Sequence, residues 1–341
     1  MNIEQRKKDH VRLSASGEAA YVKTAGFERF DFNHSALPEV DFNEIETSVD
    51  FLGYEAGFPL FISSMTGGYV EAGKVNQIIA GFCQDKRIPF GVGSQRIMLD
   101  QPETAESFSI VRREAPDAFI ASNIGGCQII GGLSASQLKL LTDTIEANAI
   151  IVHLNVLQEL MQPEGDRQFR GILEGITDLI NRTDLPVIVK ETGAGISGQT
   201  ARQLMDCGVS VIDVSGSGGT SWSKIENQRR SLHGSAFDEW GIPTVDCILQ
   251  AREKGVPKEQ LIASGGVRSV TEMGKALCLG AGFTAMAQPV IRQINEGGRD
   301  ALEMWYETLA HEFKIILCLL GCRKVSELSE DHIRKVDYFS K

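Results

Sequence analysis

A dense group of polar residues occupies the segment 153–169, HLNVLQELMQPEGDRQF. His153 and Asn155 are two residues apart, so on an extended strand their side chains would face the same side. Gln158 and Glu159 follow, and we place them in the loop after the strand. Amides position a substrate but are poor bases, and of these four residues only Glu159 is a carboxylate. The cluster favours a ligand site over the ordinary alternatives, a core histidine and a glutamate at a helix start.

Lys190 closes an otherwise apolar run, PVIVK (186–190), where a buried charge without a partner would cost several kcal/mol. A ligand that needs a cation would explain it, and so would an ion pair with Glu191 or Asp213. A flavin is one such ligand, because a cation beside its N1–C2=O edge stabilises the negative charge that develops on reduction. The residue alone leaves both explanations open. Further hydrogen bonds to a flavin ring could come from polar residues near earlier strand ends: Thr66, Ser94 and Asn123.

Glycine makes up 35 of the 341 residues, above the usual share of about 7%, and much of it follows apolar segments. The turn Ser264-Gly265-Gly266-Val267-Arg268 follows one late apolar run, and Ala285-Met286-Ala287 ends the next. Glycine leaves backbone N–H groups free to converge on an anion, and Arg268 adds positive charge. One such turn is ordinarily structural, but the two together favour a phosphate site.

Arg6, Lys7 and His10 belong to a basic run, RKKDHVR (6–12), in an otherwise acidic chain. A solvated terminus is the ordinary explanation for such a run. The alternative is an arm that brings these side chains, together with Arg96, onto a diphosphate carried by a substrate. Sequence spacing leaves both explanations open.

Short apolar runs alternate with helical stretches from residue 59 onward, which predicts a repeating strand–helix unit. Segments 134–147 and 200–207, for example, have apolar residues at helical spacing behind Ser or Thr caps. Continuous apolar strands indicate a parallel sheet buried on both faces, and eight units over about 250 residues predict an α/β fold, the (β/α)8 TIM barrel. A doubly wound sheet is the rival. The predicted strands are 59–63, 88–92, 118–121, 149–154, 186–190, 209–214, 260–263 and 282–286.

Residues 1–58 lack this alternation and predict an N-terminal arm and cap, whereas 59–341 predict the barrel and C-terminal helices. No low-complexity linker separates them, so we expect a single domain, 1–341. Pro243 and Thr244 predict a helix start rather than a ninth strand at 242–245. The run 315–320 predicts a core-facing helix.

The composition limits the partners of the chain. Its formal net charge of −11 argues against nucleic acid. No apolar run approaches the length of a membrane span, and no secretory signal precedes the first apolar strand, so we expect no membrane partner. Seven scattered cysteines without a CxxC pair predict reduced thiols in a cytoplasmic protein and argue against a zinc site.

Taken together, these motifs resemble the type 2, FMN-dependent isopentenyl-diphosphate isomerases over nearly the whole chain. The segments that carry the resemblance are RKKDH (6–10), MTGG (65–68), VGSQR (92–96), SNIG (122–125), HLNVLQE with MQPEGD (153–166), VKETG (189–193), GSGGTSW (216–222) and SGGVR (264–268).

The resemblance implies a cytoplasmic homo-oligomer, tetramer or octamer, that interconverts isopentenyl and dimethylallyl diphosphate in isoprenoid biosynthesis. It further implies that FMN is reduced by NADPH and that Mg²⁺ is needed, although the reaction is redox-neutral. Reduced flavin can offer its N5 for the proton chemistry, which would explain why the loops supply mainly amides and hydroxyls.

The resemblance also implies a role for each matching residue. FMN would be held by Met65, Thr66, Gly67, Ser94, Asn123, Lys190, Ser215, Thr220, Gly265, Gly266, Arg268, Ala285 and Met286. The substrate would be held by Arg6, Lys7, His10, Arg96, Asn155 and Gln158. The catalytic group would be Gln158, His153 and Trp222, and the Mg²⁺ ligand would be Glu159.

Two other functions compete with this one. An FMN-dependent oxidoreductase on the same barrel would want a His-Gly-Gly-Arg sequence or a cysteine after the sixth strand. The chain has only His233-Gly234-Ser235, and Thr220 stands in that loop. A flavin-free phosphate-binding barrel is the second rival, and a purified protein without flavin absorbance would favour it.

Overall fold

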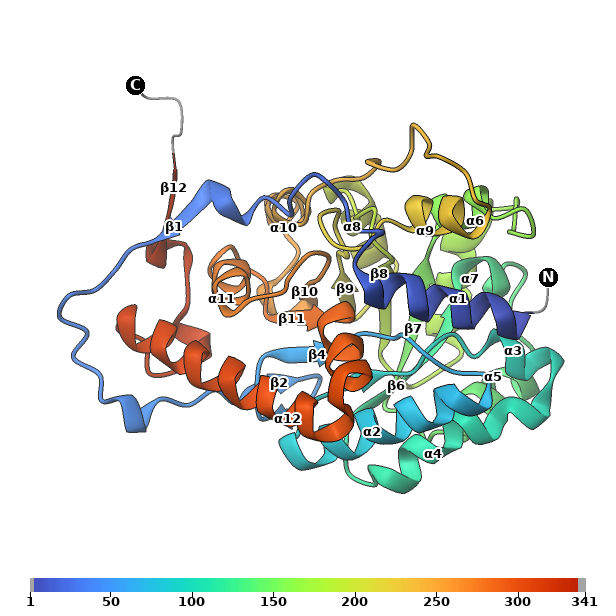
Figure 1. Cartoon of the computed structure of the whole chain (residues 1–341), viewed down its shortest axis with the longest axis horizontal. Coiled ribbons are helices and arrows are strands. Elements are labelled where there is room, and N and C mark those ends of the chain that lie inside the picture. The colour runs from blue at the N-terminus through green and yellow to red at the C-terminus, as the bar shows by residue number, and fades with distance from the viewer. Residues whose placement is uncertain (1–2, 337–341) are drawn as a thin grey trace.

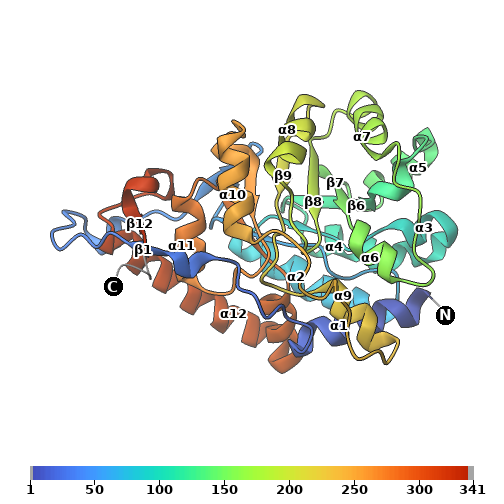
Figure 2. The ribbon, with the colours of Figure 1, turned by 90° about the horizontal axis from the view of Figure 1, so that it is seen from above.

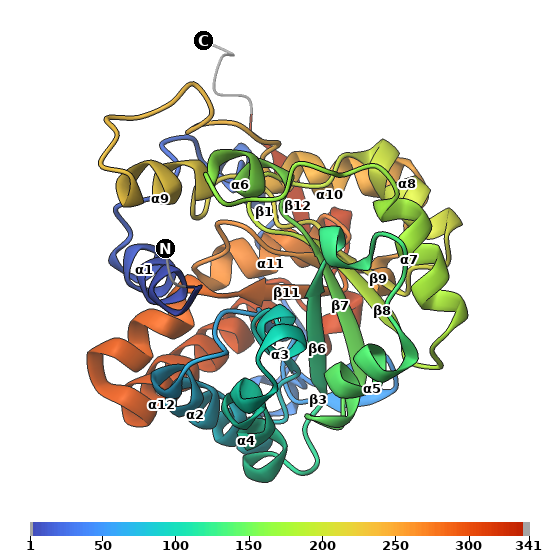
Figure 3. The same ribbon diagram turned by 90° about the vertical axis from the view of Figure 1, so that its right-hand side faces the viewer.

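The centre of the structure, a computed structural model that describes residues 3–336 and the side chains of 8–336, is a closed barrel of eight parallel strands. The strands follow the order β10-β11-β4-β5-β6-β7-β8-β9 around the barrel (Figures 1 and 3). Their bounds are β4 (Leu60–Ile62), β5 (Phe90–Gly91), β6 (Ile120–Gly125), β7 (Ala149–Leu154), β8 (Val187–Glu191), β9 (Val211–Asp213), β10 (Leu261–Ala263) and β11 (Phe283–Met286). The predicted (β/α)8 barrel is confirmed, and the doubly wound sheet is excluded.

Helices surround this barrel as the crossover connections between its strands (Figure 2). The α-helices are α1 (Ile3–Ser16), α2 (Val70–Lys86), α3 (Arg96–Asp100), α4 (Glu106–Glu114), α5 (Ala135–Asp143), α6 (Val156–Met161), α7 (Ile172–Asn181), α8 (Gly198–Asp206), α9 (Trp222–Arg229), α10 (Thr244–Glu253), α11 (Val270–Cys278) and α12 (Gln288–Leu319). The 3₁₀ helices are η1 (Phe27–Arg29), η2 (Phe42–Glu44), η3 (Pro102–Ala105), η4 (Gly126–Ile129), η5 (Lys258–Gln260), η6 (Val325–Glu327) and η7 (Glu330–His332).

Side-chain caps explain where several of these helices begin. Ser134 and Gln137 form a capping box at α5, and Ser269 with Glu272 forms another at α11. The predicted helix start at Pro243 is confirmed, because α10 begins at Thr244. In the run 315–320, Ile316, Leu317 and Leu320 are buried, whereas Ile315 and Leu319 are exposed, so only one face of that stretch meets the core. Within residues 3–336, no helix combines the length and the apolar character that crossing a membrane requires.

The middle strands differ from the sequence prediction in a way that affects the site. Strand β6 was expected over 118–121 but runs to Gly125, because it pairs with β7 as far as Gly125 opposite His153. Asn123 therefore lies inside a strand and not after one. Strand β7 ends at Leu154, and Gln158 and Glu159 lie on helix α6, so the predicted loop location of both was wrong.

The N-terminal segment covers both ends of the barrel. Helix α1 lies over the end where the parallel strands finish, against α9 and α12 (Figure 3). Strand β1 (Phe30–Phe32) pairs antiparallel with β12 (Ile333–Lys335), near the end of the described chain. The hairpin of β2 (Val49–Phe51) and β3 (Tyr54–Ala56) closes the opposite end of the barrel.

A cluster of aromatic side chains forms that closure. Phe51 of the hairpin packs against Phe61, Phe119 and Phe283, with ring centroids 5.5, 5.1 and 4.6 Å away. These three partners lie in or next to β4, β6 and β11. The hairpin therefore fills this end of the barrel with apolar side chains.

Candidate active site

Two cavities lie at the carboxyl ends of the barrel strands, and they share a wall. The first, here the serine–glycine cavity, is open to solvent, encloses about 1000 Å³ and is lined by the loops after β9, β10 and β11. The second, here the amide cavity, encloses about 1530 Å³ and is lined by residues after β4 to β7. The residues common to both are His10, Val11, Ser64, Met65, Lys190, Thr192 and Trp222. Together they form one elongated chamber.

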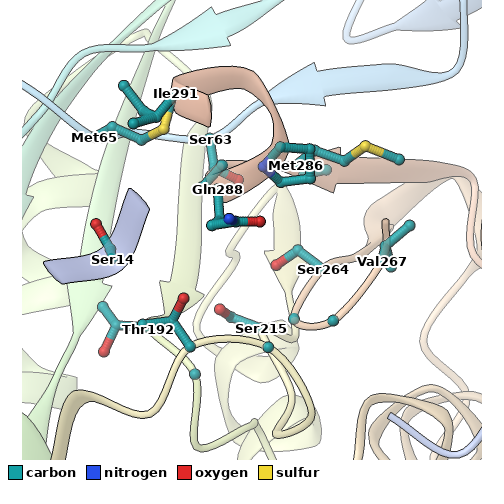
Figure 4. A pocket seen from close by; sticks show the side chains of 18 of the residues that line it. Ser14, Ser63, Met65, Thr192, Ser215, Ser264, Val267, Met286, Gln288 and Ile291 are labelled. Atoms are coloured by element: carbon teal, nitrogen blue, oxygen red, sulfur yellow. The ribbon is translucent and has the colours of Figure 1, made fainter. Parts of the chain in front are cut away.

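Close packing of two loops builds the serine–glycine cavity. Gly265 has φ +91°, and a Cβ there would lie 2.0 Å from the carbonyl oxygen of Gly216. Within residues 3–336, the buried N–H groups of Gly266 and Val267 have no hydrogen-bond acceptor. Unpaired buried N–H groups are rare, and a bound anion would satisfy them. Figure 4 shows the hydroxyl side chains that surround this cavity on separate elements: Ser14, Ser63, Thr192, Ser215 and Ser264.

Lys190 lies in the shared wall. Its side chain is buried, and Nζ donates to the backbone carbonyl of Glu191 at 2.6 Å. Among the described side chains, no carboxylate is within 4.0 Å of Nζ, so the ion pair with Glu191 or Asp213 that could have explained this cation is not formed. A buried ammonium that faces a cavity without a counter-ion suits an anionic or electron-rich ligand.

The two carboxylates beside Lys190 are held by other groups. Glu191 accepts hydrogen bonds from the backbone N–H groups of residues 192–195, including Thr192 at 2.6 Å and Gly195 at 3.1 Å. Asp213 accepts one from the Ser264 hydroxyl and one from the Ser215 N–H. Burial raises the pKa of both carboxyl groups, although the charge of Lys190 opposes the rise. Glu191 thus holds the loop after β8, and Asp213 joins the segments that follow β9 and β10.

The amide cavity contains the polar cluster predicted around residue 155. Asn155 donates from Nδ2 to Gln158 Oε1 at 3.1 Å and to Glu159 Oε1 at 3.0 Å. His153 contacts Asn123 Oδ1 through Nδ1 at 2.7 Å. Asn155, Gln158 and Glu159 are all buried, so this group of amides and one carboxylate is held rigidly.

The segment that follows α6 folds back and orients Arg96. The N–H of Asp166 donates to Glu159 Oε2 at 2.8 Å, and the Asp166 carboxylate accepts from Arg96 at 3.0 Å and from Gln128 at 2.9 Å. Arg96 remains about half exposed in this ion pair. The guanidinium is therefore held at the cavity edge by an ion pair, and its exposed part can still donate to a ligand.

Helix α1 contributes His10 to both cavities. Its Nε2 lies 2.7 Å from Oε1 of the fully buried Glu226, and its ring packs edge-on against Trp222 with centroids 5.0 Å apart. Glu226 is also paired with Arg229, one helical turn further along α9. Arg6 and Lys7 belong to the same helix α1, but their side chains lie outside the described residues.

Thr66 and Arg268 line the chamber, but the Thr66 hydroxyl is hydrogen-bonded within the protein and Arg268 is exposed. The Thr66 hydroxyl donates to Asn76 Oδ1 on α2 at 2.6 Å, so its proton is already used within the protein. Arg268 lies exposed at the rim, with its backbone N–H bound to Glu272. Both residues still belong to the lining, Thr66 in the amide cavity and Arg268 in the serine–glycine cavity.

All predicted site residues with described side chains line one cavity or the other. The serine–glycine cavity has Ser215, Thr220, Gly265, Gly266, Arg268, Ala285 and Met286, and the amide cavity has Thr66, Gly67, Ser94, Arg96, Asn123, His153, Asn155, Gln158 and Glu159. His10, Met65, Lys190 and Trp222 line both. Their individual roles remain predictions.

Sequence reasoning missed several lining residues on or next to helices α1, α6 and α12. Ser14 of α1 and Gln288 and Ile291 of α12 line the serine–glycine cavity, and Gln162 lines the amide cavity. Glu226, the partner of His10, was missed as well. On a helix with charges along it, Glu226 looks like a surface residue, and only the SGGTSW loop just before α9 hinted that this helix starts at the site.

The donor set does not resemble a dedicated transition-metal centre. Among the described residues, no three His, Cys, Asp or Glu side chains come together in metal-binding geometry. Glu159 lines the amide cavity, and each of its carboxylate oxygens contacts one N–H donor although it can accept more than one. A single carboxylate fits Mg²⁺ that keeps most of its waters and binds a diphosphate.

Comparison with known sequences finds one matching family model and several relatives that share one name. A family model described as FMN-dependent dehydrogenase matches residues 146–335. A protein of Pelodictyon phaeoclathratiforme named isopentenyl-diphosphate delta-isomerase is 40% identical, with 95% of each chain covered. Proteins of the same name from Nostoc sp. and Metallosphaera sedula are 41% and 38% identical, over 95% and 96% of this chain and 94% and 91% of theirs.

Comparison with solved structures finds the same barrel. A flavocytochrome b2 variant superposes with a TM-score of 0.69 at 20% identity, over 96% of this chain and 82% of that one. A mandelate oxidase variant superposes with a TM-score of 0.65 at 17% identity, over 97% and 94%. At these identities the likeness concerns the fold.

Proposed function

Because the chain belongs to the isopentenyl-diphosphate delta-isomerase family, within the FMN-dependent dehydrogenase group, and is an enzyme of that kind, we propose that it moves the double bond of isopentenyl diphosphate to give dimethylallyl diphosphate with the help of reduced FMN and Mg²⁺. The observation that carries the cofactor part of the proposal is Lys190, a buried cation in the wall between two cavities with no described carboxylate partner within 4.0 Å.

The residues of the serine–glycine cavity fit FMN. The N–H groups of Gly266 and Val267 would bind its phosphate, with the Arg268 charge at the rim. Lys190 would lie beside the ring, where it favours the reduced, more negative form. When bound and reduced, FMN would supply an acid–base centre at N5.

The amide cavity would hold the diphosphate and the alkene. His10 and Arg96 both line it, and Glu159 would bind the Mg²⁺ that neutralises part of the diphosphate charge. Arg6 and Lys7 are proposed as further cations from α1. Moving a double bond needs protonation at one carbon and deprotonation at another, with cationic character between them.

Gln158 and Trp222 would position the reacting carbons. Gln158 is held by Asn155, and the indole of Trp222 is fixed by a 2.8 Å hydrogen bond from Nε1 to the Thr192 carbonyl. An aromatic face near developing positive charge is stabilising. His153, in the same cavity, is proposed as the third catalytic group.

The decisive test is an anaerobic incubation of the protein with FMN, NADPH, Mg²⁺ and isopentenyl diphosphate in D₂O, followed by NMR. The proposal requires dimethylallyl diphosphate and incorporated deuterium, and both should disappear when FMN is left oxidised. If neither appears while the flavin is fully reduced, the isomerase function is wrong.

A hydroxy-acid oxidase function is disfavoured by the position of His233. This residue, the nearest sequence approach to the histidine that such oxidases use, is exposed and lines neither cavity. Oxygen consumption with lactate or mandelate should therefore stay at background under the same flavin loading.

Three accompanying proposals extend beyond the site. NADPH would be the electron source for FMN, the chain would assemble as a tetramer or octamer, and the protein would be cytoplasmic. Anaerobic titration with NADPH, followed by bleaching of the flavin absorbance, tests the first, and light scattering of the purified protein tests the second.

A further inference from the structure

Glu191 holds the backbone of the loop that follows strand β8. Its side chain is buried, and its Oε2 accepts hydrogen bonds from the backbone N–H groups of four successive residues, 192–195. The bond from Thr192 measures 2.6 Å and the bond from Gly195 measures 3.1 Å. Hydrogen bonds to an ionised acceptor are stronger than those between neutral groups. One carboxylate therefore fixes the orientation of several successive peptide groups.

One of these peptide groups connects Glu191 to Trp222. The N–H of Gly193 donates to Glu191 Oε2, and the carbonyl of Thr192 accepts from the indole Nε1 of Trp222 at 2.8 Å. That N–H and that carbonyl belong to the same peptide group, which is planar, so they point in opposite directions from one rigid unit. A rotation of the unit would break both hydrogen bonds at once.

Close packing leaves the indole little freedom to follow a displaced loop. Gly193 has φ +146°, and a Cβ there would lie 2.8 Å from the carbonyl oxygen of Thr220 and 3.7 Å from Cδ1 of Trp222. On its other side, the indole meets the ring of His10 edge-on. Thr192 and Trp222 line both cavities, and Figure 4 shows the Thr192 side chain at the serine–glycine cavity.

We propose that Glu191 is a positioning residue: through the peptide group between Thr192 and Gly193 it sets the orientation of the Trp222 indole in the wall that the two cavities share. Glu191 itself lines neither cavity, so it reaches the indole through the loop. The orientation of the indole does not depend on the proposed function. The consequence for turnover rests on it, because an aromatic ring stabilises positive charge with its face and not with its edge.

The test is NMR of the FMN-loaded protein with ¹⁵N-labelled tryptophan, read at the indole N–H signals. The chain has three tryptophans, and the signal of Trp222 is the one that Trp222→Phe removes. Glu191→Met removes the acceptor, so the Trp222 signal should shift, and its indole proton should exchange with solvent about tenfold faster. Glu191→Gln keeps an acceptor oxygen without the charge and should give an intermediate result.

Glu327→Gln is the matched control. Glu327 also accepts from backbone N–H groups of its own loop, those of Arg323 and Lys324, but it lines neither cavity. Its replacement should leave the Trp222 signal and the turnover unchanged. In Glu191→Met, kcat should fall about ten- to hundredfold, as expected when a group beside the reacting atoms is misplaced, with a smaller change in KM.

An unmoved Trp222 signal in Glu191→Met overturns the proposal, whatever the turnover of that variant. If Glu191→Met does not fold, deuterium exchange of the wild-type protein decides: the N–H groups of 192–195 must exchange slowly, and exchange at the rate of an open loop overturns the proposal. A Trp222 signal that responds as expected, in a protein whose wild type shows no isomerase activity, would instead count against the proposed function.

Discussion

Lys190 and Glu191 are neighbours in sequence but face opposite sides of strand β8. Because side chains alternate along a strand, the lysine points into the chamber while the glutamate binds the N–H groups of its own loop. The positive charge of Lys190 therefore lies on the cavity side of β8, and the negative charge of Glu191 lies on the opposite side of the strand. This separation of charge is the physical basis for binding an electron-rich ligand there.

Replacing Lys190 by Met should weaken reduced FMN more than oxidised FMN. The unbranched side chain is largely kept, and the charge beside the ring is lost together with the hydrogen bond to the Glu191 carbonyl. We expect about a tenfold greater loss for the reduced form, equivalent to ~1.4 kcal/mol. Anaerobic and aerobic binding titrations measure the two affinities.

Lys258→Met is the control for this change. Lys258 is also partly buried and donates to a backbone carbonyl, that of Leu328, but it lines neither cavity. Its replacement should leave both FMN affinities unchanged. Equal losses for the two redox forms in Lys190→Met would contradict a charge-specific role.

Glu159→Gln should raise the Mg²⁺ concentration needed for half-maximal activity. The amide keeps the hydrogen bond to the Asp166 N–H through its oxygen but loses the negative charge that attracts the cation. An increase of about tenfold or more is expected. An unchanged Mg²⁺ titration would remove Glu159 from the metal site.

The thiol of Cys127 reports on the charges around the amide cavity. Its pKa is raised to about 11, mainly by burial and then by the nearby carboxylates of Asp166 and Glu159. Its thiolate fraction is therefore small at pH 8 and grows as the pH rises toward that value. Asp166→Asn removes one nearby anion, so the pKa of Cys127 should fall and its alkylation by iodoacetamide at pH 8 should accelerate.

Peptide mass spectrometry measures this alkylation rate, with Cys207 as the internal reference. The Cys207 rate should be the same in wild type and Asp166→Asn. A Cys127 rate that is unchanged or slower in the variant would show that Asp166 does not influence the thiol.

At the level of elements, a single arginine joins three segments of the barrel wall. Arg112 of α4 donates to the carbonyls of Ala115, Pro116 and Ala118 before β6, and to those of Ile145 and Glu146 before β7. Its guanidinium thus supplies hydrogen bonds to the backbone carbonyls of the two segments that lead into β6 and β7. The strands that carry Asn123 and His153 start from this junction.

Arg112→Lys should lower the free energy of unfolding by roughly 2–4 kcal/mol, because an ammonium keeps the charge but cannot reach so many carbonyls. Arg113→Lys, on the next residue, alters an exposed ion pair with Glu106 and should change stability by less than about 0.5 kcal/mol. Urea denaturation of both variants measures the difference. Similar losses in the two would contradict the role of Arg112 as a junction.

At the scale of the whole molecule, the N-terminal segment covers one end of the barrel and narrows the other. The hairpin β2–β3 fills one end with Phe51, and α1 narrows the other. Phe51→Ala should lower the free energy of unfolding by about 3–5 kcal/mol, as for other buried aromatics. Phe237→Ala, at an exposed position, should cost less than about 0.5 kcal/mol.

Thermal and chemical unfolding of both phenylalanine variants decides this prediction. If Phe51→Ala unfolds like wild type, the hairpin does not contribute to the stability of the barrel and only covers it.

The parts of the fold that depend on local sequence pattern could be predicted from the sequence alone. Each barrel strand contains or adjoins a short apolar run, so the presence of all eight was predictable, although β6 continues past the predicted end through Asn123 to Gly125. The hairpin β2–β3 was not, because strands of three residues give no periodicity to detect. The contact of His10 with Glu226 joins residues 216 apart, and no local rule connects them.

The pairing of β1 with β12 has a consequence for synthesis on the ribosome. Phe30 lies opposite Lys335, so a segment made early waits for one made much later before it finds its partner. Phe51 likewise waits for Phe283. Such distant contacts make folding slow and leave apolar strands exposed in the meantime. Nascent chains of this protein should therefore expose these apolar segments to chaperones until the later partners have been synthesised.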